Sequence, residues 1–358
     1  MRPVFRLPMC SALGVIVLLA VPAATQAAQK SVDMGTPRAS QRAFLRIGTD
    51  VNDFFPHRVT IRAGDRVRFV PTALHTVNLP ARGGGKLPLI LPTGQKVAGA
   101  VDAAGAPFFF NGQDQVGFNP RLLTSNFGKR RTYTGSSQVL SGLPLARRPQ
   151  PMTVRFPRTG TFRYFCDLHL GMTGIVRVVG SRRRVPSARE DRASVREQVA
   201  STLRTARSLV RNSRQPANTV DVGLEGRGRA NFFGFAPARL TVPTGTTVTF
   251  REGARSETHT ATFGPGNPAS EPTSYLGQIA GSLESPAFDP RAVYPSDPGP
   301  AAPFTPTYHG NGFWNSGALD RDPGTPLPTS NTVRFSAPGT FTVYCLIHPF
   351  MRGTVTVQ

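Results

Sequence analysis

The sequence predicts an all-β protein in which two β-sandwich domains are joined by a helical segment. The 358 residues suffice for two domains, and 39% hydrophobic with 17% charged residues is a globular composition. Short segments of alternating polarity are separated by Gly and Pro turns, which is typical of sandwiches and barrels. Motifs of the first half recur in the second half, which indicates duplicated domains.

The first residues have the pattern of a secretory signal over residues 1–27. Arg2 and Arg6 precede an apolar stretch over residues 12–21, and small residues at 25–27 allow cleavage near Ala27. This stretch is too short for a membrane anchor, and no later segment has the roughly 20 apolar residues of a transmembrane helix. We therefore expect a protein without a transmembrane anchor that is secreted or located in the periplasm or cell envelope.

An internal repeat organises the remaining chain. The string Thr-Val-Arg-Phe occurs at residues 153–156 and again at 332–335, and Gly-Thr-Phe at 160–162 and 339–341, both at a spacing of 179 residues. A period this long indicates two related domains rather than a solenoid. We expect the first domain over residues 40–180, a basic linker over 181–216 and the second domain over 217–358.

Alternating residues predict the strands of each domain. In the first domain we expect strands at residues 58–61 and 66–70, with Val67 and Phe69 facing the core; their counterparts in the second domain are 239–242 and 246–250. Residues 162, 164 and 166 share one face of a later strand, as do 341, 343 and 345, because successive side chains of a strand alternate. That face is expected to belong to the core.

The linker contains the one segment with a helical pattern, residues 187–212. Its apolar residues recur at spacings of three and four, at positions 195, 199, 203, 206 and 210. The simplest interpretation is a spacer packed on one sandwich, and docking of a partner is the alternative. Each domain also has a long Gly/Pro-rich excursion, at residues 79–151 and 265–330, whose role the composition does not define.

Charge is unevenly divided between the domains. Residues 40–180 carry 19 basic and 6 acidic side chains, whereas residues 217–358 carry 9 and 10. A basic first domain can attract an acidic redox partner or an anionic envelope surface, although a solvated arginine-rich surface is an equally simple explanation. An exported chain without interleaved aromatic residues is not expected to bind nucleic acid.

Two identical Cys-x-x-His-x-x-Met strings carry the chemistry. Cys10 falls in the signal, so the mature chain has two cysteines, and one further histidine lies upstream of each at an equivalent place. A thiolate, two imidazoles and a thioether are the ligands of a mononuclear blue copper site, with the thioether as the weak axial ligand. The candidate ligands are His75, Cys166, His169 and Met172 in the first domain, and His259, Cys345, His348 and Met351 in the second.

At these residues the chain resembles the cupredoxin family of plastocyanin, pseudoazurin and amicyanin, and residues 345–353 resemble the amicyanin ligand loop. The resemblance implies a Greek-key β-sandwich for each domain, one type 1 copper per domain, and electron transfer through the exposed edges of His169 and His348. Family members commonly have Asn after the upstream histidine. Here Thr76 and Thr260 stand there, which bears on how the two ligand loops are tied together.

Two structural alternatives remain open. Cys166 and Cys345 can form a disulfide, as an even pair in a secreted protein often does. One domain can also have lost its metal, and the first is the candidate because residues 166–172 form the less typical ligand loop. Neither alternative explains why both complete ligand sets recur at the same spacing.

The expected function is that of an exported electron carrier with two copper ions per chain, and not that of an enzyme. Four protein ligands leave no open position for a substrate, and the chain lacks the additional His pairs of multicopper oxidases. His57 and His309 are expected to be surface or turn residues, with His309 as a possible interdomain contact. The alternatives are copper storage, delivery or tolerance, a two-domain copper oxidase or nitrite reductase, and an adhesive envelope protein.

Overall fold

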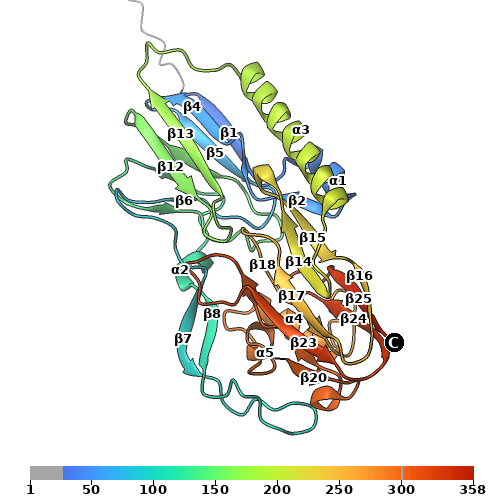
Figure 1. Ribbon diagram of the computed structural model, residues 1–358. Coiled ribbons are helices and arrows are strands. Elements are labelled where there is room, and N and C mark those ends of the chain that lie inside the picture. The colour runs from blue at the N-terminus through green and yellow to red at the C-terminus, as the bar shows by residue number, and fades with distance from the viewer. Residues whose placement is uncertain (1–26, 300) are drawn as a thin grey trace, which may run out of the picture.

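The structure, a computed structural model, describes residues 27–299 and 301–358. The expected signal therefore lies outside the described residues except for Ala27. The chain folds as two β-sandwiches, with helix α3 (Ala188–Asn212) running beside the first and ending at the edge of the second (Figure 1). This confirms the all-β prediction and its helical linker. In the described part of the chain, no helix is long and apolar enough to cross a membrane.

The first sandwich packs two five-stranded sheets against each other. One sheet has the order β3 (Phe54–Phe55), β1 (Gln29–Met34), β5 (Arg66–Pro71), β11 (Met152–Arg155) and β9 (Arg130–Thr132). The other has the order β10 (Val139–Leu140), β6 (Asn78–Leu79), β12 (Gly160–Phe165), β13 (Thr173–Val179) and β4 (Arg58–Arg62).

The second sandwich has the same strand order, with one strand added at an edge. Its larger sheet has the order β2 (Thr49–Val51), β15 (Ala230–Ala236), β14 (Thr219–Glu225), β17 (Thr247–Glu252), β23 (Ser330–Phe335) and β20 (Ala302–Phe304). Its second sheet has the order β16 (Arg239–Val242), β25 (Arg352–Val357), β24 (Gly339–Tyr344), β19 (Thr262–Phe263) and β21 (Trp314–Asn315). The added strand β2 comes from the first half of the chain.

Alternation in the sequence explains the core of each sandwich. Val67 and Phe69 of β5 are fully buried, as the period of two predicts, whereas Arg66 and Arg68 point away from the core. The strands expected at 58–61 and 239–242 are β4 and β16. The first sandwich begins before residue 40, because β1 pairs in parallel with β5 from Gln29 onward. Strand β1 has two buried residues, Val32 and Met34. A pattern this short, next to the signal segment, was not enough to predict a strand.

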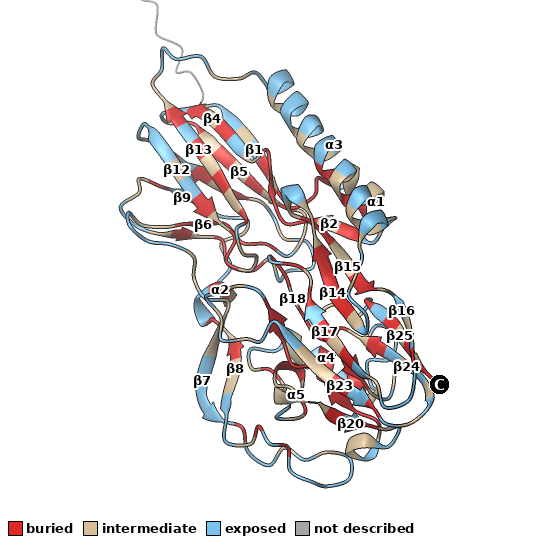
Figure 2. Cartoon of the chain, viewed as in Figure 1, coloured by how far each residue is buried: buried red, intermediate tan, exposed pale blue. Residues whose placement is uncertain are grey.

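The two sandwiches are joined by more than the linker. Strand β2 pairs with β15 of the second sandwich, with Val51 opposite Ala230. Helices α1 (Arg38–Leu45) and α3 cover this junction, and Ala206 of α3 packs in a cluster with Phe44 and Ala230. The helix thus contacts both domains, whereas the sequence suggested one. Its outer face is exposed (Figure 2), and a capping box of Ser187 and Glu190 begins it.

The long excursions pack against each other beside the second sandwich. The hairpin of β7 (Ile90–Lys96) and β8 (Asp114–Phe118) reaches down to it (Figure 1), and Phe110 shares a core with Leu276 and Phe313. The excursions also contain α2 (Pro120–Leu123), α4 (Tyr275–Gly281), α5 (Pro290–Val293), and the short 3₁₀ turns Ser282–Glu284 and Tyr308–Gly310. A third turn, Arg227–Arg229, precedes β15, and β18 (Thr258–His259) pairs with β22 (Leu319–Asp320).

Candidate metal centres

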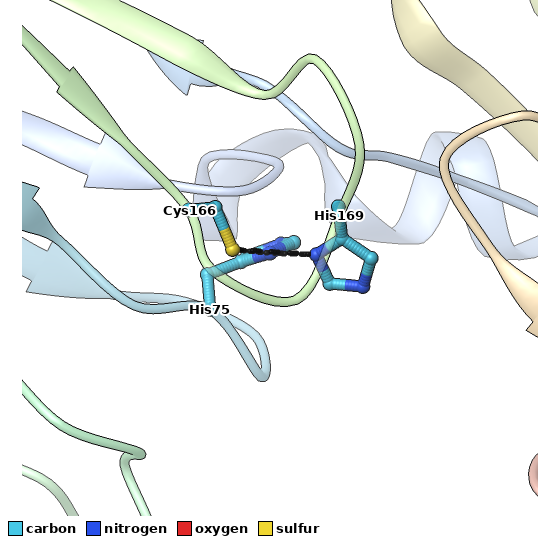
Figure 3. A group of neighbouring side chains, drawn as sticks. All are labelled: His75, Cys166 and His169. Atoms are coloured by element: carbon cyan, nitrogen blue, oxygen red, sulfur yellow. Dashed lines mark hydrogen bonds between the residues drawn. The ribbon is translucent and has the colours of Figure 1, made fainter. Parts of the chain in front are cut away.

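Three of the four candidate ligands of the first domain converge at one end of its sandwich. His75 lies just after β5, Cys166 directly follows β12, and His169 lies in the loop before β13 (Figure 3). The Sγ atom of Cys166 lies 3.5 Å from His169 Nδ1 and 3.9 Å from His75 Nδ1, and the two Nδ1 atoms are 2.9 Å apart. A thiol and two imidazole nitrogens therefore face one point.

The fourth candidate, Met172, is held in the same tight loop. The backbone N–H of Cys166 donates to the carbonyl of Met172 at 2.9 Å, and the N–H of Met172 donates to the carbonyl of His169 at 3.2 Å. Met172 is buried in the cluster that contains Cys166. The loop thus closes on itself and keeps the buried methionine in the same cluster as the cysteine.

Burial gives the first set the protonation states that a metal needs, apart from the thiol. It lowers the pKa of His75 to about 3, and it lowers the pKa of His169 well below the ordinary value, so both imidazoles are neutral at neutral pH. Burial raises the pKa of the Cys166 thiol, and the thiol must release its proton when a metal binds.

In each domain a threonine joins the two ligand loops, at the position where the resemblance implies asparagine. The N–H of Thr76 points at Cys166 Sγ from 3.5 Å, and its hydroxyl oxygen accepts from the N–H of Asp167 at 2.8 Å. In the second domain, the N–H of Thr260 lies 3.4 Å from Cys345 Sγ, and its hydroxyl oxygen accepts from the N–H of Leu346 at 2.8 Å. The hydroxyl thus joins the loop of the upstream histidine to that of the cysteine.

The second ligand set occupies the same place in its sandwich but is arranged differently. The N–H of His348 donates to Cys345 Sγ at 3.3 Å, and Met351 closes the loop through its carbonyl, which accepts from Cys345. Nδ1 of His259, however, is hydrogen-bonded to the buried carboxyl of Glu252 at 3.0 Å. Burial raises the pKa of Glu252 and lowers that of His259 to about 3.

Two ring nitrogens of the second set lack a partner within the described structure. His259 Nε2 and His348 Nδ1 are buried without a hydrogen bond. Buried polar atoms are nearly always satisfied, so such atoms fit a site that receives an ion. Among the described residues, only the first set has three ligand atoms within 4.8 Å of one another. The sequence made the first domain the candidate for an empty site. In the structure, however, it is the first domain whose ligand atoms lie closer together.

The donor sets suit copper in chemical type. Each combines one thiol, two imidazoles and a buried thioether, the group preferred by copper in blue sites, whereas a zinc site would favour more thiolates or a carboxylate. Cys166 and Cys345 are both free, so no disulfide joins the two sets.

Comparison with solved structures finds similarity over part of the chain. The chain is similar to oxidised plastocyanin from Dryopteris crassirhizoma, with 27% identity over 39% of this chain and 99% of that one, at a TM-score of 0.21. It is also similar to a reduced amicyanin variant (18% identity, 41% and 88% covered, TM-score 0.22) and to a purple cupredoxin from Nitrosopumilus maritimus (16%, 39% and 98%, 0.20). No family model matches the chain, and no curated protein matches it.

Glycines that the sequence did not single out shape both sites. A Cβ atom on Gly35 would lie 2.7 Å from Nε2 of His75, and one on Gly223 would lie 2.5 Å from Cε1 of His259. Both glycines have positive φ, +97° and +70°. A Val-Asp-x-Gly string precedes each upstream histidine, at residues 32–35 and 220–223, and this repeat was the available signal.

The sequence also gave no indication of Glu257, which lies between the two sites. Its Oε1 atom is 3.4 Å from Nε2 of His169 and its Oε2 atom is 3.7 Å from Nε2 of His348. Burial raises the pKa of Glu257 to about 8. The carboxyl group lines a cavity of about 540 Å³ together with both histidines, and the exposed side chains of Leu74 and Phe350 also line it.

The two remaining histidines lie away from the ligand sets. His57 is hydrogen-bonded to Asp53 at 3.1 Å beside α3. His309 joins the two excursions, because its Nδ1 atom lies 2.8 Å from Asp102 and its Nε2 atom 3.2 Å from Asp297. The interdomain contact considered for His309 is therefore present between the excursions.

Proposed function

We propose that this protein is an exported electron carrier with one mononuclear type 1 copper centre in each domain. The observation that carries the proposal is the convergence of Cys166 Sγ with the Nδ1 atoms of His75 and His169 beside the buried Met172. The second set, with His259, Cys345, His348 and Met351, repeats the same residue types at the end of the same strands. We assign the protein no catalytic role of its own.

In this proposal the protein residues hold a fixed cage. The bound copper would supply the one-electron chemistry by alternating between Cu(I) and Cu(II). Cys166 and Cys345 would provide the thiolates, and the two histidines and the methionine of each set would complete the donors that hold the metal. The threonine ties and the closed loops keep the cage the same in both oxidation states, so little rearrangement accompanies transfer.

The proposal extends to the protein's location and partner, for which the sequence provides the support. The signal pattern at residues 1–27 is the basis for proposing a secreted, periplasmic or cell-envelope protein. The basic first domain is suited to an acidic redox partner protein, because complementary charge accelerates encounter. The same surface is suited to electrostatic association with an anionic envelope.

Copper titration of the mature protein tests this function. The wild-type chain is expected to bind two equivalents with intense thiolate-to-copper absorption, and Cys166→Ser and Cys345→Ser are each expected to remove one. Colour that is absent from the wild type, or unaffected by both substitutions, would contradict the proposal. Fast reversible reduction by a partner, rather than metal exchange with chelators, distinguishes an electron carrier from a storage protein.

One observation favours a second candidate function, a small two-domain copper reductase or oxidase. The cavity of about 540 Å³ touches His169, His348 and the carboxyl of Glu257, so a small molecule inside it would contact the edges of both centres. Turnover of nitrite or oxygen, or a copper content above two per chain, is the result that would favour this candidate.

A further inference from the structure

The edges through which each centre would exchange electrons face each other rather than solvent. The side chains of His169 and His348 are only 12% and 22% exposed, and their Nε2 atoms lie 3.4 and 3.7 Å from the carboxyl oxygens of Glu257. Glu257 itself is 5% exposed, so it lies inside the domain junction. One side chain of the second domain therefore contacts a candidate ligand from each domain.

The protonation of the ring nitrogens of His169 and His348 determines how Glu257 can interact with them. An imidazole that gives its Nδ1 lone pair to a metal carries its proton on Nε2 and is a donor at that atom. His169 Nδ1 lies 3.5 Å from Cys166 Sγ, and His348 Nδ1 is buried without a hydrogen-bond partner, so in each histidine Nδ1 is the atom available to a metal. With copper on Nδ1, the two Nε2–H groups would therefore lie beside the two oxygens of one carboxyl group, at 3.4 and 3.7 Å.

The junction holds this carboxylate in place. Nδ2 of Asn52, from the first domain, donates to Glu257 Oε1 at 2.6 Å and lies 3.2 Å from Oγ of Ser256. Asn52 directly follows β2, which is paired with β15 of the second sandwich, so backbone hydrogen bonds fix the domains at this point. The contacts of Glu257 with His169 and His348, at 3.4 and 3.7 Å, therefore lie in an interface that backbone pairing holds together.

We propose that Glu257 couples the two copper centres into one redox unit, with electrons passing between the domains through His169, Glu257 and His348. This inference rests on the proposed function, since it needs a copper ion in each domain. In the transfer step one electron would pass from Cu(I) of one centre to Cu(II) of the other. No bond forms or breaks, and both Nε2 protons stay on their rings.

The carboxylate has two separable effects, and two variants separate them. The positive charge of copper bound on either side would favour the ionised form of this buried carboxyl group. The resulting negative charge would lie beside both centres and favour Cu(II) over Cu(I) in each, so Glu257→Gln is expected to raise both reduction potentials together. Glu257→Asp keeps the charge but is one methylene shorter, so it cannot contact both rings. We expect potentials close to the wild type in this variant and internal transfer slowed about tenfold or more.

Asp50→Asn is the matched control. Asp50 lines the same cavity, but its carboxyl is bonded to Thr36 and to the N–H of Val51, and it contacts neither histidine. This variant is expected to keep the wild-type potentials and the wild-type rate of internal transfer.

The measurement uses the copper-loaded full chain. Flash reduction with less than one equivalent of a small reductant is followed by the redistribution of the electron, a first-order phase whose rate is independent of protein concentration. Cys166→Ser and Cys345→Ser are expected to abolish this phase. As a structural readout, the Nε2–H signals of His169 and His348 in nitrogen NMR of the Cu(I) protein are expected to move in Glu257→Gln and to stay in Asp50→Asn.

Copper content and colour, measured first on every variant, keep the two proposals distinguishable. A wild-type chain without two blue centres overturns the proposed function and this inference with it. Two blue centres in Glu257→Gln and Glu257→Asp, with unchanged potentials in the first and an unchanged transfer rate in the second, overturn the coupling alone.

Discussion

Replacing Gly35 by alanine tests how the fold positions an upstream ligand. Two costs are expected. Gly35 has φ +97°, and a residue with a Cβ atom in this region costs about 1–3 kcal/mol. The new Cβ atom would also lie 2.7 Å from Nε2 and 2.8 Å from Cδ2 of His75, so the buried ring must move. Because ligand distances are fixed to about 0.2 Å, we expect copper affinity at this site to fall about 10- to 100-fold.

Gly64→Ala separates strain from displacement of the ligand. Gly64 has φ +95°, almost the value of Gly35, but a Cβ atom there meets nothing closer than 4.0 Å. Urea unfolding is expected to show the cost of strain in both variants and a larger total loss of stability in Gly35→Ala, because the buried ring of His75 must also move. Copper titration is expected to show loss of one equivalent of high-affinity colour only in Gly35→Ala, with the second domain unaffected. Equal affinity and absorption in the two variants would refute the positioning of His75 by Gly35.

Three further predictions concern the supports of the sites. Thr76→Val leaves the N–H of Asp167 without its acceptor and should cost about 1–3 kcal/mol in urea unfolding, whereas Thr76→Ser should restore most of it. Ser187→Ala removes the capping box with Glu190 and should lower stability by about 1 kcal/mol, with no change in copper colour. Burial would lower the pKa of His309, but hydrogen bonds to its two aspartates outweigh burial and raise it. The protonated form is thus the stabilising one, so the cost of His309→Gln should be full below the unfolded pKa of 6.5 and should disappear as the pH rises through the folded pKa. A cost that grows with pH would contradict this assignment.

Most of what the sequence predicted about the strands and the candidate ligands came from the internal repeat and from local patterns of residues. Strand alternation and Gly turns are local, so β4, β5 and β16 appear in the sequence at nearly the observed bounds. The ligand residues are recognisable because a tight loop requires the same spacing of Cys, His and Met in both domains. The helix over Ala188–Asn212 follows from its own apolar stripe.

What could not be predicted depends on contacts between distant segments. Glu257 corresponds to no acidic residue in the first domain, and nothing near it in sequence reveals that His169 lies 3.4 Å away. The excursions look structureless in sequence because they bury apolar residues against distant segments, as Phe110 of the first does against Leu276 of the second. Strand β2 joins the second sandwich although it lies in the first half of the chain, and local pattern cannot report such an exchange.

The two sites differ in the carboxyl groups that surround their ligands, and this difference bears on the proposed coupling. In the first site the buried carboxyl of Asp167 directly follows the cysteine, and its place in the second site is taken by Leu346. In the second site Glu252 bonds His259, and the equivalent place at the end of β5 is Pro71. A carboxyl beside the thiolate and one beside an imidazole act on different ligands, so the two potentials are expected to differ. A shared bridge between identical centres would only distribute electrons evenly, whereas between unlike centres it gives internal transfer a preferred direction.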